Sequence, residues 1–155
     1  MKELLFSGFL IMSMVLAAQE NNYTKQIELT NTTEDAWQLI ADVSQWKHWD
    51  SHVVDAQLEG GILDNSKGII VTSNSKIVDF EIVEFKQGES YTLRHKLSSG
   101  MVYLKRSIQS SEKGTIVKLK VWFKRLSIKN FRKYMGNDYE LILEEELQSI
   151  VQLLK

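Results

Sequence analysis

The segment YTLRHKLSSGMVYLKRSIQSSEKGTIVKLKVWF, residues 91–123, determines the fold class. Apolar and polar residues alternate along three runs, 91–97, 101–108 and 115–123, as they do in strands with one buried face. Short turns rich in serine and glycine separate these runs. Successive strands joined by such brief turns predict an antiparallel meander.

The chain before this segment continues the same pattern. Short apolar runs bounded by turn residues predict four further strands, at residues 23–29, 53–58, 69–72 and 77–85. Between the first two, Asn31-Thr32-Thr33-Glu34-Asp35 supplies side-chain oxygens and acids that suit the start of a helix containing Trp37. Asp42-Val43-Ser44 predicts a second helix start, which leads through Trp46 and Trp49.

The chain after the segment is predicted to be helical. From Phe131 to Leu154, apolar residues recur at spacings of three and four, and glutamates and a glutamine occupy the other faces. Neither proline nor glycine interrupts the stretch after Gly136. The pattern predicts one helix of about six turns, long enough to cross a sheet. The fold class is therefore α+β.

The order of these elements, with two tryptophan-bearing helices after the first strand, resembles the START-like (SRPBCC) superfamily. More narrowly, it is similar to the group of polyketide cyclase/dehydrase and lipid-transport-like small proteins. The motif is Trp37 in the first helix, followed nine residues later by the pair Trp46-x-x-Trp49. The family often has proline inside this pair, where the chain has Lys47-His48. The resemblance covers residues 23–154 and implies a helix-grip fold, in which a curved sheet wraps around the C-terminal helix.

The resemblance also implies a function class. Members of the superfamily hold lipids, sterols, polyketides or other hydrophobic compounds in a cavity between sheet and helix, and a minority are enzymes. They share no catalytic motif, so no catalytic residue is carried over. We expect a monomeric binding or carrier protein for a small hydrophobic molecule, without a cofactor. The alternatives are an enzyme of the cyclase, dehydratase or isomerase type, and a protein-interaction module of the chaperone-activator type.

The predicted strands place two polar residues on inward faces. His95 alternates with Tyr91 and Leu93, and Arg106 alternates with Leu104. A buried guanidinium needs a partner, which we expect to be Glu81 or Glu84, water at the rim, or a ligand carboxylate. The predicted cavity residues are Phe80, Ile82, Tyr91, Leu93, His95, Leu104, Arg106, Leu119, Val121, Phe123, Met135, Tyr139, Ile142 and Leu143.

Composition excludes several other function classes. A formal net charge of -1, from 19 basic and 20 acidic residues, does not favour a nucleic-acid partner. A basic cluster comprises Lys118, Lys120, Lys124, Arg125 and Lys129 and continues to Arg132 and Lys133. It is interpreted as the solvated face of one strand, with a phosphate-binding patch as the alternative. The absence of cysteine excludes disulfides and thiolate chemistry. His48 and His52 lie four residues apart near Asp50 and Asp55, but no third ligand is evident, so we expect no metal and assign Asp50 and both histidines to the solvated surface.

The N-terminal segment differs from the rest of the chain. Lys2 is followed by an uncharged run, residues 4–18, that ends in Leu16-Ala17-Ala18. This layout predicts a secretory signal peptide at residues 1–18 and a mature domain at 19–155, exported to the periplasm or secreted. A run of about 15 residues is shorter than the roughly 20 that a membrane span needs, so we expect no membrane span after cleavage. Translation from Met12 or Met14 would instead give a cytoplasmic protein.

Overall fold

A computed structural model describes residues 21–155. The predicted signal peptide lies outside the described residues. Seven strands form one antiparallel sheet. Their bounds are β1 Asn22–Leu29, β2 Val53–Leu58, β3 Lys67–Thr72, β4 Ile77–Lys86, β5 Ser90–Leu97, β6 Gly100–Ser111 and β7 Gly114–Lys124.

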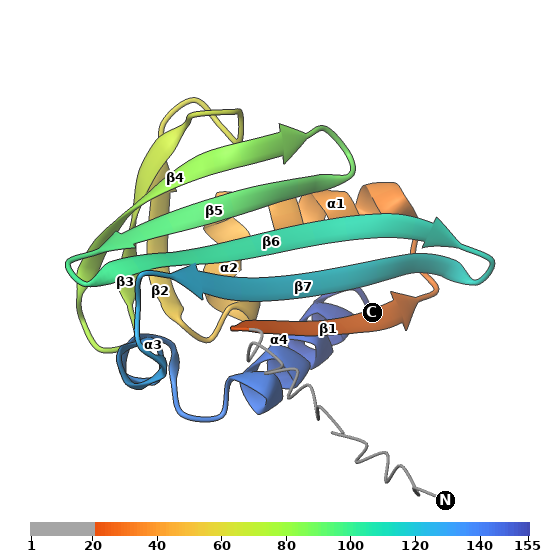
Figure 1. The fold of residues 1–155 in the computed structure, drawn as a ribbon. Coiled ribbons are helices and arrows are strands. Elements are labelled where there is room, and N and C mark those ends of the chain that lie inside the picture. The colour runs from red at the N-terminus through yellow and green to blue at the C-terminus, as the bar shows by residue number, and fades with distance from the viewer. Residues whose placement is uncertain (1–20) are drawn as a thin grey trace, which may run out of the picture.

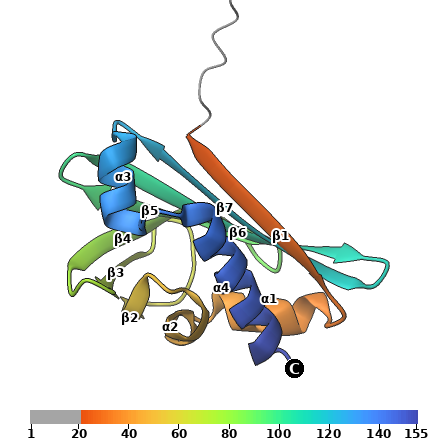
Figure 2. The same ribbon diagram turned by 90° about the horizontal axis from the view of Figure 1, so that it is seen from below.

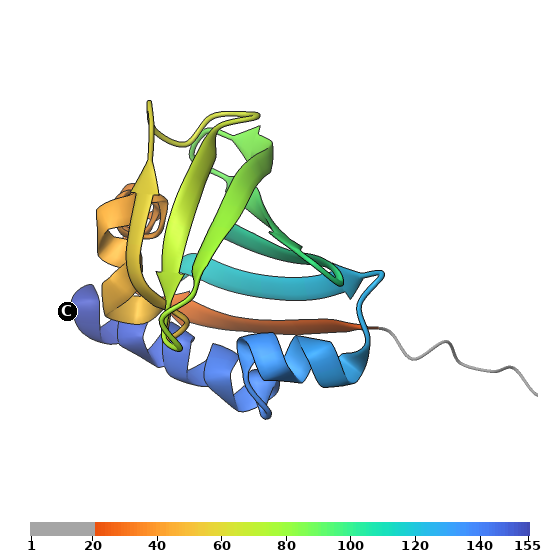
Figure 3. The ribbon, with the colours of Figure 1, turned by 90° about the vertical axis from the view of Figure 1, so that its left-hand side faces the viewer.

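The sheet is a meander of six strands to which the first strand is added at one edge. The strand order is β1-β7-β6-β5-β4-β3-β2, so β2 to β7 pair in sequence and β1 returns to pair with β7. Register shifts interrupt the pairing of β2 with β3 and of β4 with β5. Bulges of this kind increase the local bend and twist of a sheet. Figure 3 shows the result, a sheet that curves from β1 along the base to the upright strands β2 and β3.

Five helical segments of the described chain lie on the concave side and at one end of the sheet (Figures 1 and 2). They are α1 Thr33–Ala41, the 3-10 turn η1 Val43–Gln45, α2 Trp46–Trp49, α3 Ile128–Met135 and α4 Tyr139–Leu153. The predicted helix starts are confirmed. Thr32 Oγ1 accepts from the backbone N–H of Asp35 at 3.2 Å, and Asp42 Oδ1 accepts from that of Ser44 at 2.9 Å.

The C-terminal helix is shorter than its sequence pattern predicts. The prediction of a single helix of about six turns was wrong. The helix is interrupted between Met135 and Tyr139, which gives two helices, α3 and the 15-residue α4. Gly136 causes the break with a φ of 113° and a ψ of 158°, a backbone conformation available in practice only to glycine. A Cβ atom at this position would lie 2.5 Å from Ile142 Cδ1. The break turns α3 away from α4, across one end of the sheet (Figure 2).

The core fills the space between the concave face and the helices. The alternating residues of β5, β6 and β7 point into it, together with Trp37, Trp46, Leu143 and Ile150 from the helices. The predicted α+β class with a helix-grip arrangement is therefore confirmed. None of the helices between residues 21 and 155 is long and apolar enough to span a bilayer.

Candidate functional site

A buried cation lies at the centre of the molecule. Arg106 is 3% exposed and forms an ion pair with Asp50, whose side chain is equally buried. The guanidinium carbon lies 4.6 Å from the ring centroid of Trp46 and 4.5 Å from that of Trp49. Both tryptophans of the Trp-x-x-Trp motif therefore contact one arginine. Aromatic faces attract a cation through their quadrupole, and the attraction is stronger where water is excluded.

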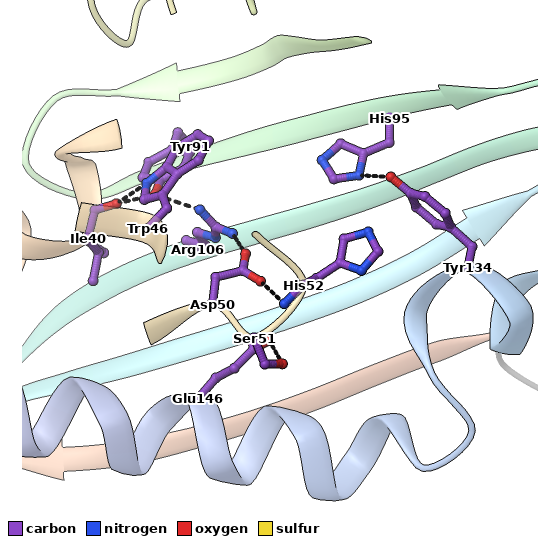
Figure 4. A network of polar contacts seen from close by, with 10 residues as sticks. All are labelled: Ile40, Trp46, Asp50, Ser51, His52, Tyr91, His95, Arg106, Tyr134 and Glu146. Carbon is purple, nitrogen blue, oxygen red and sulfur yellow. Dashed lines mark hydrogen bonds and ion pairs between the residues drawn. The ribbon is translucent and has the colours of Figure 1, made fainter. Parts of the chain in front are cut away.

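Tyr91 connects this cation to the first helix. Arg106 Nη1 donates to the Tyr91 hydroxyl at 3.3 Å, and that hydroxyl donates to the carbonyl of Ile40. The indole N–H of Trp46 donates to the same carbonyl at 3.0 Å. The carbonyl oxygen near the end of α1 is thus satisfied by two side chains, and the network ties α1, α2, β5 and β6 together (Figure 4).

The prediction that Glu81 or Glu84 pairs with Arg106 was wrong, because its partner is Asp50. Glu81 pairs with Arg94, and Glu84 pairs with Lys105, both on the outer face of the sheet. The interpretation of Asp50 as solvated surface was also wrong, because the turn after α2 directs this carboxylate inward. Helix α2 has only four residues, which is too few for periodicity to show whether the residue that follows it, Asp50, is buried.

The interpretation of His52 as solvated surface was likewise wrong, whereas His48 is exposed as expected. His52 is 5% exposed and packs edge-on against Tyr134 of α3, with ring centroids 4.7 Å apart. On the other side of Tyr134, its hydroxyl lies 3.0 Å from Nδ1 of the buried His95. Figure 4 shows Tyr134 reaching from α3 toward both imidazoles. Among the described residues, Nε2 of His52 and Nε2 of His95 have no hydrogen-bond partner.

Burial keeps both imidazoles neutral. It lowers the pKa of His95 well below the ordinary value, and the charges of His52 and Arg106 lower it further. Burial also lowers the pKa of His52, although the charge of Asp50 opposes this effect. A neutral imidazole has one ring nitrogen that donates and one that accepts. The pair therefore offers hydrogen bonds without net charge.

A buried carboxyl group lies on the helix side of the core. Glu146 of α4 is 4% exposed and accepts a hydrogen bond from Ser51 Oγ at 3.3 Å. Burial raises its pKa well above the ordinary value, and the nearby charge of Asp50 adds to the effect. Both effects favour the protonated form of this carboxyl group over the charged form. Among residues 21–155, the interior holds one ion pair, Arg106 with Asp50, and burial favours the uncharged form of Glu146, His52 and His95 around it.

An open groove of about 660 Å³ lies at the end of the sheet beside α3. The ends of β4 and β5, the turn after β5 and one face of α3 form its walls. Its lining residues are Lys76, Ile77, Val78, Asp79, Lys96, Leu97, Ser98, Ser99, Asn130, Lys133 and Tyr134. Tyr134 therefore contacts the groove on one side and the two buried histidines on the other.

The predicted cavity residues lie in the core between the concave face of the sheet and the helices. All are buried except Ile142, which is partly buried, but their side chains fill most of the space between them. The hollow that Leu104, Arg106, Leu119, Val121, Tyr139 and Leu143 share with Glu146 measures about 10 Å³, close to the minimum that one water molecule needs. None of the fourteen lines the large groove, and their role in ligand binding stays a prediction.

Several polar residues of the site were missed from the sequence. Asp50, His52 and Tyr134 were not predicted as site residues, and neither was Glu146. One signal could have identified Asp50, since it directly follows the second tryptophan of the Trp-x-x-Trp pair. Glu146 gave a weaker signal, because it lies among Glu144 and Glu145 in an acidic run.

Comparisons with known proteins identify the fold. No model of a protein family matches the chain, and no curated protein matches it. Protein MLL2253 from Mesorhizobium loti superposes with a TM-score of 0.69 at 11% identity, over 86% of this chain and 96% of that one. The di-domain ARO/CYC protein StfQ of the steffimycin biosynthetic pathway gives 0.65 at 10% identity, over 85% of this chain and 49% of StfQ. DynU16, from the dynemicin biosynthetic locus, gives 0.67 at 7% identity, over 87% of this chain and 47% of DynU16.

At these identities the likeness concerns the fold alone. The chain corresponds to about half of each of the two proteins from biosynthetic loci and to nearly the whole of the Mesorhizobium protein. The fold is the one that the resemblance to the START-like superfamily implied, and it is compatible with binding a hydrophobic ligand.

Replacement of Asp50 should destabilise the protein strongly. Asp50→Ala leaves the guanidinium of Arg106 buried without a counter-charge, and breaking a buried pair in this way typically costs about 3–5 kcal/mol. Glu81→Ala is the matched control, since it breaks the half-exposed pair with Arg94 and should cost about 1 kcal/mol or less. Urea unfolding monitored by tryptophan fluorescence measures both changes. Equal losses in the two variants would contradict the structural role assigned to Asp50.

The contribution of His95 to the free energy of unfolding should decrease as the pH falls from 7 to 5. Because the pKa of His95 is lowered in the folded state, the unfolded chain takes up the proton first, below about pH 6.5. His95→Gln should reduce this slope by up to about 1.4 kcal/mol per pH unit. Glu146 acts in the opposite direction, since its raised pKa favours the folded state as the pH falls. A series of urea titrations over this pH range measures the slope for both proteins, and an unchanged slope in His95→Gln would contradict the lowered pKa of His95.

Proposed function

We propose that the protein binds and carries a small hydrophobic molecule, which enters between the sheet and the C-terminal helices through the groove beside Tyr134. The observation that carries this proposal is the position of the groove. The groove is a large opening at the end of the sheet beside α3. One of its lining residues, Tyr134, also contacts the buried His95. Ligand sites in proteins are typically concave, with a few placed polar groups that fix the ligand's orientation.

Tyr134 is the point at which the groove and the interior meet. Its ring occupies the boundary, and its hydroxyl uses one nitrogen of His95. A ligand oxygen that replaced this hydroxyl would keep Nδ1 of His95 satisfied, and the unpaired Nε2 atoms of His52 and His95 are available to other polar groups of the ligand. When Tyr134 moves aside, the inner apolar residues, among them Phe80 and Phe123, become contacts for the rest of the ligand.

The groups around Tyr134 favour one class of ligand. The imidazoles of His52 and His95 are neutral, so they suit a hydroxyl, a carbonyl or an unionised acid better than a buried charge. The rim carries Lys76, Lys96 and Lys133 against a single acid, Asp79. We therefore favour an amphipathic molecule of lipid, sterol or polyketide type, with an oxygen at its inner end.

An enzyme is the second candidate, favoured by the contact between His95 and Tyr134. A buried neutral imidazole with a free nitrogen can act as a general base, and the tyrosine would orient it. In this case the site would act on an enolisable hydrophobic substrate, as in a cyclase, a dehydratase or an isomerase. The carrier proposal is preferred because the groove leads to neutral hydrogen-bonding groups, which suit the binding of an amphipathic molecule without any reaction.

Export is part of the proposal, and it depends on the sequence of residues 1–18 alone. An exported carrier would be isolated from its host with a mature mass that begins near Ala18 or Gln19. Native mass spectrometry of such material, followed by denaturing spray, would show an additional mass that is lost on unfolding and would identify the ligand. A ligand-free mass with Met1 retained would contradict export.

Filling the groove should weaken the binding of a hydrophobic probe. Leu97→Trp places a larger ring in the groove wall and should weaken the binding of 1-anilinonaphthalene-8-sulfonate by roughly tenfold or more, equal to about 1.4 kcal/mol. Thr24→Trp adds the same ring at an exposed position of β1 and should leave the affinity unchanged. Fluorescence titration measures both, and thermal unfolding shows whether each variant is folded. Equal affinities in the two variants would exclude the groove as the site.

The carrier and the enzyme differ in the effect of His95→Ala. If the protein is a carrier, this change should weaken probe binding, and neither the variant nor the unchanged protein should turn over a candidate substrate. If it is an enzyme, the change should abolish turnover of a candidate substrate while binding is only weakened. Assay of His95→Ala beside Tyr134→Phe, with binding and turnover measured on the same samples, separates the two functions.

A further inference from the structure

The end of the molecule that contains the groove has a distinct surface composition. We call the groove-lining residues, residues 124–127 and α3 together the groove end. Its basic residues are Lys76, Lys96, Lys124, Arg125, Lys129, Arg132 and Lys133, and its one acidic residue is Asp79. The chain as a whole has a net charge of -1, so positive charge is concentrated at this end.

These cations are not neutralised by ion pairs. Six ion pairs are formed among residues 21–155, and none of them includes a basic residue of the groove end. Lys129, Arg132 and Lys133 are exposed and follow the i, i+3, i+4 spacing, so they lie on one face of α3. Phe131 and Met135 form the buried face. A short basic amphipathic helix of this kind is typical of segments that lie on membrane surfaces.

Two large apolar side chains are exposed at the same end. Ile77 is 70% exposed in the groove wall, and Ile128 is 42% exposed at the first position of α3. Close by, on the outer face, Tyr103 stacks on Trp122 with centroids 5.2 Å apart, and Lys120 and Lys124 lie over these rings. Lysines combined with aromatic and aliphatic side chains are suited to the boundary between lipid headgroups and acyl chains.

The path of the chain adds an independent indication. β1 begins at this end, because Tyr23 stacks on Phe131 of α3 with ring centroids 5.5 Å apart. In the sequence, the uncharged run of residues 4–18 comes shortly before β1. An apolar segment attached at this point would bring the groove end toward a membrane during export, before the segment is cleaved.

We infer that the groove end docks on an anionic lipid bilayer, with α3 lying on the headgroups, so that the groove opens directly toward the lipid. The basic residues provide the attraction to anionic headgroups, and Ile77 and Ile128 insert at the interface. The inference rests on the proposed carrier function for its purpose, since a hydrophobic ligand can then pass between bilayer and groove without crossing water.

Site-specific labels test this orientation in the full chain. The protein has no cysteine, so Ser99→Cys in the β5–β6 turn and Glu112→Cys in the β6–β7 turn each provide a unique labelling site. The two turns lie at opposite ends of the sheet (Figure 1). With phosphatidylcholine vesicles containing phosphatidylglycerol, an environment-sensitive fluorophore at position 99 should shift to shorter wavelength and be quenched by lipid-borne nitroxides. The fluorophore at position 112 should not respond.

Charge reversal tests the cause of docking. Lys129→Glu with Arg132→Glu should weaken the response at position 99 by roughly tenfold or more in vesicle concentration, because each basic residue near an anionic surface contributes substantially to binding. Lys86→Glu with Lys113→Glu makes the same change in charge away from the groove end and should have little effect. Phosphatidylcholine vesicles alone should bind much more weakly than the mixed vesicles.

Three results would overturn the inference: equal responses at positions 99 and 112, no dependence on lipid charge, or no effect of the reversal on α3. A response to polyglutamate or RNA without any response to vesicles would also overturn it, in favour of an anionic macromolecule. Probe binding by 1-anilinonaphthalene-8-sulfonate is measured without vesicles, and docking is measured without the probe. Failure of the docking inference is therefore distinguishable from failure of the carrier proposal.

Discussion

The buried guanidinium of Arg106 is the constraint on which the rest of the interior depends. A charge removed from water must be compensated, and the fold brings three elements together around this one group. The turn after α2 supplies the carboxylate of Asp50, α2 supplies the faces of Trp46 and Trp49, and β5 supplies the hydroxyl of Tyr91. Helix α2 is held against the sheet because it and the turn after it carry these compensating groups, and α1 joins the network through the carbonyl of Ile40.

The pairing of Arg106 with Asp50 influences which of the other buried titratable groups can carry a charge. With Asp50 paired to Arg106, the other titratable groups are in a dry environment that disfavours further charge. Burial raises the pKa of Glu146 and lowers those of His52 and His95, so it favours the uncharged form of all three groups. The interior behind Tyr134 therefore combines apolar walls with neutral hydrogen-bonding groups, while the positive charge of the groove end remains at the surface.

The sequence predicted the parts of this arrangement that follow from local periodicity. Alternation in β5 and β6 correctly placed His95 and Arg106 on the inward face, because the period of two in a strand leaves only two choices. It could not identify Asp50, which lies in a turn where no period applies. The break at Gly136 was missed because the apolar spacing continues across it, and only the backbone conformation of that glycine separates α3 from α4. The groove was unpredictable for the same reason, since α3 forms part of its wall.

The pairing of β1 with β7 has a consequence for how the chain folds. Leu29 pairs with Thr115 and Asn22 with Trp122, so the first strand has no partner until almost all of the sheet has been synthesised. The hairpins from β2 to β7 can form from neighbours in sequence, whereas the last edge requires closing a loop of most of the chain. The N-terminal strand should accordingly be the last to join the sheet during folding, and its neighbour β7 remains an unpaired, aggregation-prone edge until then.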